Sequence, residues 1–318
     1  MERGREHAST GVGSVTHSRR LLISTVSMVV CVLALPFGIF ASETGSSPAA
    51  AAAPRRVDIR AAHHPGYDRI VFEFDGGMPE LTKVRWADRL KLEPSDKPAR
   101  VQGAAFLKVR FRQAVAHVGA APTFGPAREA YGLPNINQVV LLGDFEGQVS
   151  VGIGLMERTE IRSRFRLHDP ARFVVDISTR FPKQRVPVYF VDYDKVVAGA
   201  PTVVSAVTRH VRKIDPKRGA LQRLYAGPTA SEKARGLRFV PSRTYGFHHL
   251  FTNRFGVTRV QLRGRCDSRG SAVATVAHQI RATLMARPAV HWVKIYGPDG
   301  TTIWPTGRSH SDPYCLQP

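Results

Sequence analysis

Histidines and serines that could support catalysis occur in this sequence, but they do not form a recognisable catalytic motif. The chain has twelve histidines and no His-Glu-x-x-His pair, which would place two zinc ligands on one face of a helix. It also has no Gly-x-Ser-x-Gly turn to expose a serine nucleophile. The adjacent pairs His63-His64 and His248-His249 lie in or beside expected strands, where neighbouring side chains point to opposite faces. We therefore expect neither pair to chelate one metal ion.

Paired carboxylates are a further route to hydrolysis, because a glycosidase needs two of them on either side of the sugar. The candidates are Glu73, Asp75, Glu146 and Asp176. Glu73 alternates with apolar residues, and pairing with an arginine would account for it. The sequence therefore predicts a protein that is not an enzyme and uses no cofactor or metal. A hydrolase whose active site the sequence does not reveal is the alternative.

Aromatic and arginine side chains offer a binding surface instead of a catalytic site. Tyr67 and Arg69 stand at a junction between a loop and a strand, and Arg85 and Trp86 stand on what we take to be a neighbouring strand. Such groups can stack on sugar faces or clamp carboxylates. Tyr67 and Trp86 could equally be core residues. The same two interpretations hold for two residues near the C-terminus, Trp304 and Arg308.

An apolar N-terminal segment decides where these residues act. Residues 21–41 carry no charge and follow Arg19 and Arg20, so residues 1–41 have the layout of a signal peptide. The segment is also long enough to remain as a membrane anchor. In both cases the Arg-rich flank stays in the cytoplasm and the rest is exported, by the general or the twin-arginine route. Residues 42–56 are small and Pro-containing, which predicts a disordered linker.

The exported part of the chain is strongly basic. Residues 1–41 hold four arginines and two glutamates, so +19 of the net charge of +21 remains after them. A field of this sign attracts polyanions. Outside the cytoplasm these are anionic wall polymers, lipid headgroups and acidic glycans, and we expect no nucleic acid and no membrane contact beyond the N-terminal segment. The alternative is that the dispersed charges only cover a solvated surface.

Cysteine usage agrees with export. Cys31 lies inside the apolar segment, which leaves Cys266 and Cys315 in the exported part. Two cysteines in an oxidising compartment most simply form one disulfide. No further metal ligands stand beside them at a matching spacing, so we expect a disulfide rather than a metal site or a free thiol.

Residues 57–180 alternate apolar and polar side chains in short runs that are typical of half-buried strands. Turns such as 145–147 and 169–171 separate the runs. Residues 113–138 read as a loop with at most a short helix. Many short strands with regular turns predict a β-sandwich. The expected strands cover 57–61, 70–74, 81–86, 104–111, 139–144, 149–153, 159–167 and 172–177.

Three stretches in this half resemble the AMIN-like domain of exported bacterial proteins. They are 66–74 (GYDRIVFEF), 164–167 (RFRL) and 172–177 (RFVVDI). The resemblance covers about 58–179. It implies a β-sandwich that holds proteins in the cell envelope, through peptidoglycan, and it does not imply catalysis.

Residues 185–318 combine strands with two helices, which predicts an α+β fold with a mixed sheet. The helix expected at 216–226 has Pro216 in its first turn. The second, at 271–286, repeats apolar residues at spacings of three and four, with Val273 as the first. The expected strands cover 186–191, 203–211, 243–251, 257–263 and 290–296.

This second half resembles a GerMN domain, the sporulation and germination module of bacterial envelope proteins. The stretches that carry the likeness are 186–192 (VPVYFVD), 224–229 (LYAGPT) with Glu232 and Gly236-Leu237, and 290–296 (VHWVKIY). The resemblance covers about 186–305. The two late cysteines depart from it and predict a disulfide-stapled version of the domain.

Together these features predict a two-domain α+β protein on the outer side of the membrane or in the cell wall. We expect its AMIN-like sandwich to bind peptidoglycan or another anionic wall polymer. The GerMN-like domain is expected to dock a protein partner of the envelope.

Overall fold

The computed structural model describes residues 53–268 and 273–317. The expected signal peptide or anchor at 1–41 and most of the linker at 42–56 lie outside the described residues. Among the helices that are described, none is both long and apolar enough to cross a bilayer. The described residues form one compact unit, which contains two large hydrophobic cores.

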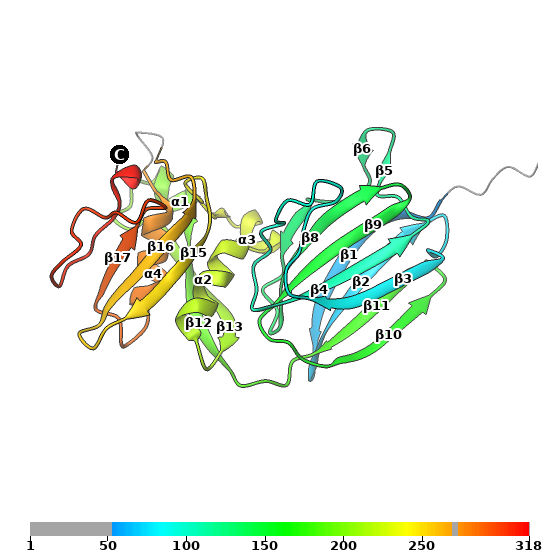
Figure 1. Cartoon of the computed structure of the whole chain (residues 1–318), viewed down its shortest axis with the longest axis horizontal. Coiled ribbons are helices and arrows are strands. Elements are labelled where there is room, and N and C mark those ends of the chain that lie inside the picture. The colour runs from blue at the N-terminus through cyan, green and yellow to red at the C-terminus, as the bar shows by residue number, and fades with distance from the viewer. Residues whose placement is uncertain (1–52, 269–272, 318) are drawn as a thin grey trace, which may run out of the picture. The chain divides into compact units, whose positions relative to one another are not determined.

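The first core lies between two antiparallel sheets, drawn in Figure 1. One sheet has the order β1-β2-β11-β10, and the other has the order β3-β4-β9-β8-β7. A small hairpin, β5-β6, stands apart from both sheets. The strands are β1 (Arg55–His64), β2 (Tyr67–Asp75), β3 (Leu81–Ala87), β4 (Ala105–Arg112), β5 (His117–Val118), β6 (Ala121–Pro122), β7 (Arg128–Ala130), β8 (Ile136–Phe145), β9 (Gln148–Leu155), β10 (Ile161–Leu167) and β11 (Arg172–Ser178).

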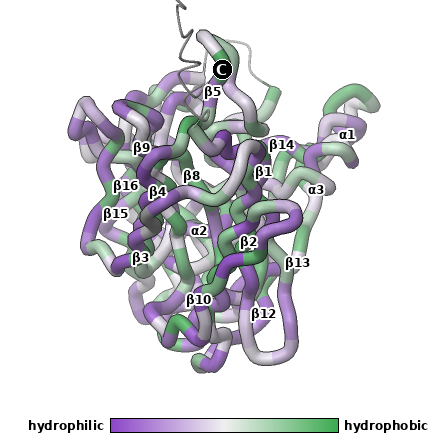
Figure 2. The backbone as a smooth tube through the Cα atoms, turned by 90° about the vertical axis from the view of Figure 1, so that its right-hand side faces the viewer, coloured by the Kyte–Doolittle hydropathy of each residue, from purple (hydrophilic) through white to green (hydrophobic). Residues whose placement is uncertain are grey.

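Alternation along the strands builds this core, as the sequence predicts. Hydrophilic and hydrophobic positions follow one another along strands such as β2 (Figure 2). Phe72 of β2 packs against Phe111 of β4, with ring centroids 5.1 Å apart, and Phe111 lies 5.8 Å from Phe173 of β11. Both sheets therefore contribute rings to one aromatic cluster, which fixes the distance between them.

Two expectations for this half are wrong. Strand β1 begins at Arg55, so Arg55 and Arg56 belong to the sheet and not to a linker ending at residue 56. Arg56 is buried, its guanidinium lies 3.6 Å from the centre of the Phe124 ring, and burial lowers its pKa to about 10. The stretch 113–138, expected to be a loop with at most a short helix, instead contains β5, β6 and β7 and the start of β8.

The second core lies in an α+β arrangement of two three-stranded sheets and four α-helices, where the sequence predicts one mixed sheet and two helices. The sheet β13-β12-β14 is antiparallel, and the sheet β15-β16-β17 is mixed because β16 and β17 run parallel. The elements are β12 (Lys183–Asp192), α1 (Tyr193–Val197), β13 (Val204–Arg212), α2 (Pro216–Ala226), α3 (Ala230–Ala234), β14 (Leu237–Arg238), β15 (Thr244–Thr252), β16 (Val257–Gly264), α4 (Val276–Met285), β17 (Trp292–Tyr296) and a 3₁₀ turn (Tyr314–Leu316).

Helix caps decide where the two longer helices begin. Helix α2 has the predicted bounds, with Asp215 accepting a hydrogen bond from the Arg218 backbone and Pro216 in the first turn. Helix α4 starts at Val276, because the Thr275 hydroxyl accepts from the Ala277 backbone. The helix expected from residue 271 is therefore too long, and Val273 lies before it with 65% of its surface exposed.

Arg223 ties α2 to the segment that leads into β8. It is fully buried, and burial lowers the pKa of its guanidinium to about 9. Its acceptors are the carbonyl oxygens of His210, Leu133, Pro134 and Ile136 and the side-chain oxygen of Asn137, at 2.6 to 3.3 Å. Neutral oxygens thus solvate a buried cation, which makes this contact costly to break.

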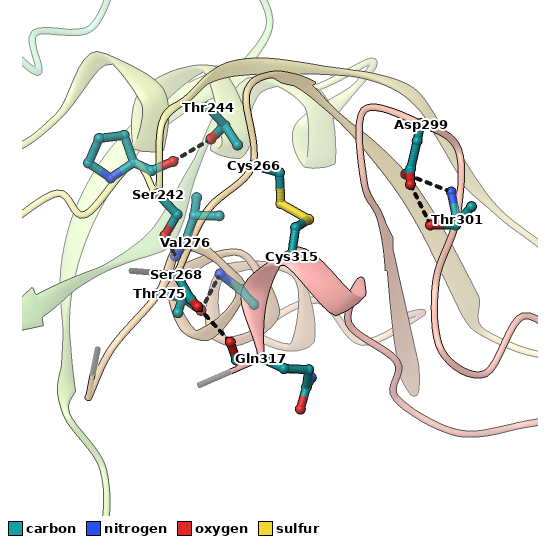
Figure 3. The surroundings of a disulfide bond; sticks show 12 residues. Ser242, Thr244, Cys266, Ser268, Thr275, Val276, Asp299, Thr301, Cys315 and Gln317 are labelled. Carbon is teal, nitrogen blue, oxygen red and sulfur yellow. Dashed lines mark hydrogen bonds between the residues drawn. A yellow bond between two sulfur atoms is a disulfide. The ribbon is translucent and has the colours of Figure 1, made fainter. Parts of the chain in front are cut away.

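The predicted disulfide is present between Cys266 and Cys315, whose Cα atoms are 5.5 Å apart (Figure 3). Beside it, Ser268 donates its backbone N–H to the Cys315 carbonyl at 2.9 Å and its hydroxyl to the Gln317 carbonyl at 2.5 Å. The bond therefore holds the C-terminal 3₁₀ turn against the segment that follows β16.

We predict that replacing both Cys266 and Cys315 by serine lowers the free energy of unfolding by about 4 kcal/mol. The cause is the restored freedom of the unfolded loop of 49 residues that the bond closes. Urea unfolding of the double variant and of the oxidised parent measures the difference. Adding a reductant should bring the parent to the same midpoint as the variant and should leave the variant unchanged; equal midpoints without reductant would contradict the prediction.

Candidate functional site

The outer face of the sheet β1-β2-β11-β10 brings together aromatic and charged side chains from neighbouring strands. Because Ile70 and Phe72 of β2 point into the core, Tyr67 and Arg69 point the other way. The strand register places Arg69 opposite Asp176 of β11. The outer face of this sheet therefore carries polar side chains, and its inner face packs on the hydrophobic core.

Arg69 and Asp176 form a bidentate ion pair across β2 and β11. Nε of Arg69 donates to Oδ1 of Asp176 at 2.7 Å, and Nη2 donates to Oδ2 at 2.8 Å. Ser163 of β10 donates to the same carboxylate at 2.6 Å. Burial alone would raise the pKa of Asp176, but the hydrogen bonds from Arg69 and Ser163 outweigh it and hold the pKa below its ordinary value.

Tyr67 lies half-buried between two guanidinium groups. The Cζ atom of Arg69 is 5.4 Å from the centre of the Tyr67 ring, and that of Arg162 from β10 is 5.2 Å away. The imidazole of His64 stacks on the same ring, with centroids 5.0 Å apart and planes 12° apart. The ring belongs to this surface cluster rather than to the hydrophobic core. Phe165 extends the cluster, because its ring centre lies 5.2 Å from Cζ of Arg69.

A groove of about 570 Å³ lies beside this cluster at the edge formed by β1. Arg69 and His64 line it together with Ala62. Tyr131 also lines it and donates its hydroxyl to the Ile59 carbonyl at 2.8 Å. The cluster thus borders a groove that can hold part of a ligand.

Arg85 and Trp86 do not join Tyr67 and Arg69. They lie on β3, which pairs with β4 in the opposite sheet, so the expectation that they stand on a neighbouring strand is wrong. Trp86 packs half-buried against the sandwich core, and its ring centre is 5.2 Å from Cζ of Arg158. Arg85 is exposed on the same strand.

Sequence reasoning missed the arginines that β10 contributes. The strand reads Ile161-Arg162-Ser163-Arg164-Phe165-Arg166-Leu167, so every second residue is an arginine. Such a strand cannot bury the face that carries its arginines and must lie at an exposed edge. Arg162 itself lies at a register shift between Ile161 and Ser163, so its approach to the Tyr67 ring could not be read from this alternation.

The histidine pairs behave differently from one another. Nδ1 of His63 lies 2.8 Å from Oδ1 of the buried Asp68, while His64 stacks on Tyr67. The rings of His248 and His249 are only 4.4 Å apart, because the register of β15 shifts after His248 and His249 has a φ of +48°. The expectation that this second pair points to opposite faces is wrong. Over residues 53–268 and 273–317, no three His, Cys, Asp or Glu side chains are grouped to hold a metal ion.

Three of the four candidate carboxylates are held by arginines. Glu73 accepts from Arg60 at 2.5 Å, as the sequence predicts, Asp75 pairs with Arg55, and Asp176 pairs with Arg69. The fourth, Glu146, is exposed in the turn between β8 and β9. An ion-paired carboxylate keeps its charge, which does not suit a general acid.

A second aromatic surface lies in the C-terminal half, where Trp304 has 64% of its surface exposed. The fully buried Lys294 holds the loop that carries Trp304. Its Nζ donates to the backbone carbonyls of Trp304 and Thr306 at 2.5 and 2.9 Å. Burial lowers the pKa of Lys294. Nearby, the exposed Phe255 has Cζ of Arg308 4.4 Å from its ring centre.

A protein-family model, that of the AMIN-like domain, matches residues 54–179. The match covers less than half of the chain, and the likeness holds for this stretch alone. AMIN-like domains are associated with proteins of the cell wall and peptidoglycan, and the family suggests a location in the cell envelope. The match covers both sheets of the sandwich and all residues of the cluster around Tyr67.

The AMIN-like resemblance predicted for about 58–179 is thereby confirmed. No curated protein and no solved structure matches the chain. The GerMN resemblance of about 186–305 and the export of the chain stay predictions.

We predict that Asp176→Asn lowers the free energy of unfolding by about 2 kcal/mol at pH 7, because it removes charge-assisted hydrogen bonds to a buried acceptor. The pKa of Asp176 is lowered in the folded protein, so the stability it contributes is present above its ordinary pKa of 3.8 and is lost as the pH falls through the folded value. Urea unfolding at pH 7 and pH 3 should show the deficit shrinking at the lower pH.

Asp75→Asn is the matched control, because Asp75 also pairs with an arginine but is 60% exposed. We expect its effect to stay below about 0.5 kcal/mol. An Asp176→Asn variant as stable as this control at pH 7 would show that the ion pair does not organise the face.

Proposed function

We propose that this protein is a non-catalytic component of the cell envelope whose AMIN-like domain binds peptidoglycan or another anionic wall polymer. The observation that carries the proposal is the Tyr67 ring, which stands half-exposed between Arg69 and Arg162 beside the groove along β1. An aromatic ring flanked by guanidiniums can cover the apolar face of a sugar while the cations attract acidic groups.

The proposed function requires that the protein is exported from the cytoplasm. Residues 1–41 serve as a signal peptide or as an uncleaved anchor and deliver a part with a net charge of +19 to a compartment rich in anionic polymers. The disulfide between Cys266 and Cys315 supports this, since such bonds persist in oxidising surroundings. The membrane is then contacted only through the N-terminal segment.

The absence of catalysis is supported by the state of the carboxylates. Asp176 accepts hydrogen bonds from Arg69 and Ser163, and Glu73 accepts one from Arg60. The face is therefore built to hold a ligand with fixed charges rather than to exchange protons with it.

The C-terminal half, with its GerMN-like stretches, is proposed to dock a protein partner of the envelope. Trp304 supports this, because Trp is enriched among the residues that dominate binding energy at protein interfaces. An exposed Trp on a fixed loop also loses little entropy on binding. The two halves then have separate tasks, one toward the polymer and one toward a protein.

We predict that the purified protein sediments with isolated cell-wall sacculi and that Tyr67→Ala weakens this binding at least fivefold. The loss reflects one stacked aromatic contact, worth about 1 kcal/mol or more. Tyr193→Ala is the matched control, since Tyr193 is a tyrosine of α1 that is 59% exposed and lies outside the AMIN-like domain. Equal losses in both variants, or no sedimentation of the parent, would contradict the proposed function.

The same preparation tests the non-catalytic part of the proposal. Dye-labelled sacculi incubated with the protein should release no dye above background, with or without a chelator. Release that co-purifies with the protein would show that it is a hydrolase.

For the partner we predict that a photo-crosslinking residue in place of Trp304 yields a discrete protein adduct in cells. The position is exposed and held by Lys294, so a docked partner would stay within reach of the crosslinker. A crosslinker in place of Val197, which is 70% exposed in α1, is the control and should give no such adduct. Adducts of the same pattern at both positions would indicate random collisions and would contradict docking at Trp304.

A further inference from the structure

Two arginines converge on the turn between β1 and β2. A Cβ atom placed on Gly66 would lie 3.5 Å from Nη1 of Arg162 and 3.9 Å from Nε of Arg180. Gly66 has a φ of +87°, a backbone conformation that favours glycine, and both guanidiniums reach van der Waals distance of this turn. The guanidiniums of Arg162 and Arg180 therefore lie close to each other, beside Gly66.

Neither of these arginines has a carboxylate partner among the described residues. Arg162 contacts the Tyr67 ring, and both side chains are exposed. The third guanidinium of the cluster, that of Arg69, is already neutralised by Asp176. Two like charges held together without a counter-ion repel one another, and a bound anion would relieve that repulsion.

The pair is also positioned in advance. The Tyr67 ring stacks on His64 on one side and supports Arg162, so this guanidinium is held by an aromatic surface rather than by an ion pair. Arg180 directly follows Thr179, whose backbone N–H donates to the Gly66 carbonyl at 3.0 Å. Both arginines are thus tied to the same turn from different segments.

We propose that Arg162, Arg180 and Tyr67 form a binding site for the phosphate group of a phosphodiester polymer. The two non-bridging oxygens of a phosphodiester can each accept from one guanidinium at about 2.8 Å. Arg69 already has Asp176 as its carboxylate partner, so Arg162 and Arg180 are the guanidiniums left to hold such a group. The Tyr67 ring covers the carbon atoms beside the phosphate. This inference rests on the proposed function, since it names the polymer that the face selects.

Isothermal titration calorimetry with the full-length protein in a neutral detergent tests the assignment. The probes are a short polyglycerol phosphate and an oligogalacturonate of equal charge, which carries carboxylates instead. We expect the phosphate oligomer to bind at least tenfold more tightly and its affinity to fall as salt is added. Equal affinities for the two probes would overturn the assignment to phosphate.

Single variants locate the site. Arg162→Ala and Arg180→Ala should each weaken binding of the phosphate oligomer at least fivefold, while Arg164→Ala should change it less than twofold. Arg164 is an exposed arginine of the same strand, β10, so it controls for loss of one charge. A loss with Arg164→Ala as large as with the other two would show general attraction to a basic surface and would also overturn the site.

Sacculi before and after chemical removal of their phosphate polymers separate this inference from the proposed function. Binding that falls at least fivefold after removal supports the phosphate site. Binding that persists unchanged and still depends on Tyr67 would reject the phosphate site and leave wall binding in place. Failure to bind either preparation would reject the proposed function itself.

Discussion

The ion pair between Arg69 and Asp176 is the constraint on which the candidate site depends. It joins β2 to β11 on the outer face of the sheet, and the hydroxyl of Ser163 extends it to β10. The carboxylate is largely buried, with 8% of its side chain exposed, whereas Arg69 keeps 32% exposed. A buried anion with three hydrogen bonds cannot move without losing them, so the strands that carry Tyr67 and Arg162 are held in one register.

The same pair determines which charges remain available. Because Asp176 neutralises Arg69, the field at the β1–β2 turn comes from Arg162 and Arg180, which have no carboxylate among the residues described here. The C-terminal half uses a related device, in which the buried Lys294 holds the loop of Trp304 through neutral oxygens. In the first half the buried carboxylate of Asp176 holds the strands around Tyr67, and in the second half the buried Lys294 holds the loop of Trp304. Aromatic side chains held in this way make effective binding surfaces.

The sequence predicts much of the fold because alternation and caps are local signals. Strands such as β2 and β11 and the helix α2 lie within a few residues of their expected bounds, and the disulfide follows from the cysteine count. The sheet to which β3 belongs could not be predicted, because alternation shows that one face is buried and not which sheet buries it. Residue type therefore groups Arg85 and Trp86 with Tyr67, although they lie on the opposite sheet.

The remaining errors also have local causes. The spacing of apolar residues alone predicts that α4 begins at residue 271. In the structure the hydroxyl of Thr275 caps the helix, which therefore begins at Val276. The contact of His248 with His249 depends on a register shift that no residue pattern announces. Residue type alone indicates Tyr67 and Arg69 as site residues. It does not indicate Arg162 and Arg180, because their approach to Gly66 depends on strand order.

The most direct measurement of the central claim is a chemical-shift map of the isotope-labelled protein titrated with soluble wall-polymer fragments. If the outer face of the four-stranded sheet holds the polymer, the largest shifts will fall on Tyr67, Ser163 and Asp176 and on the side-chain N–H groups of Arg162. Shifts concentrated on β3 or on the C-terminal half, with these residues unmoved, would contradict the account.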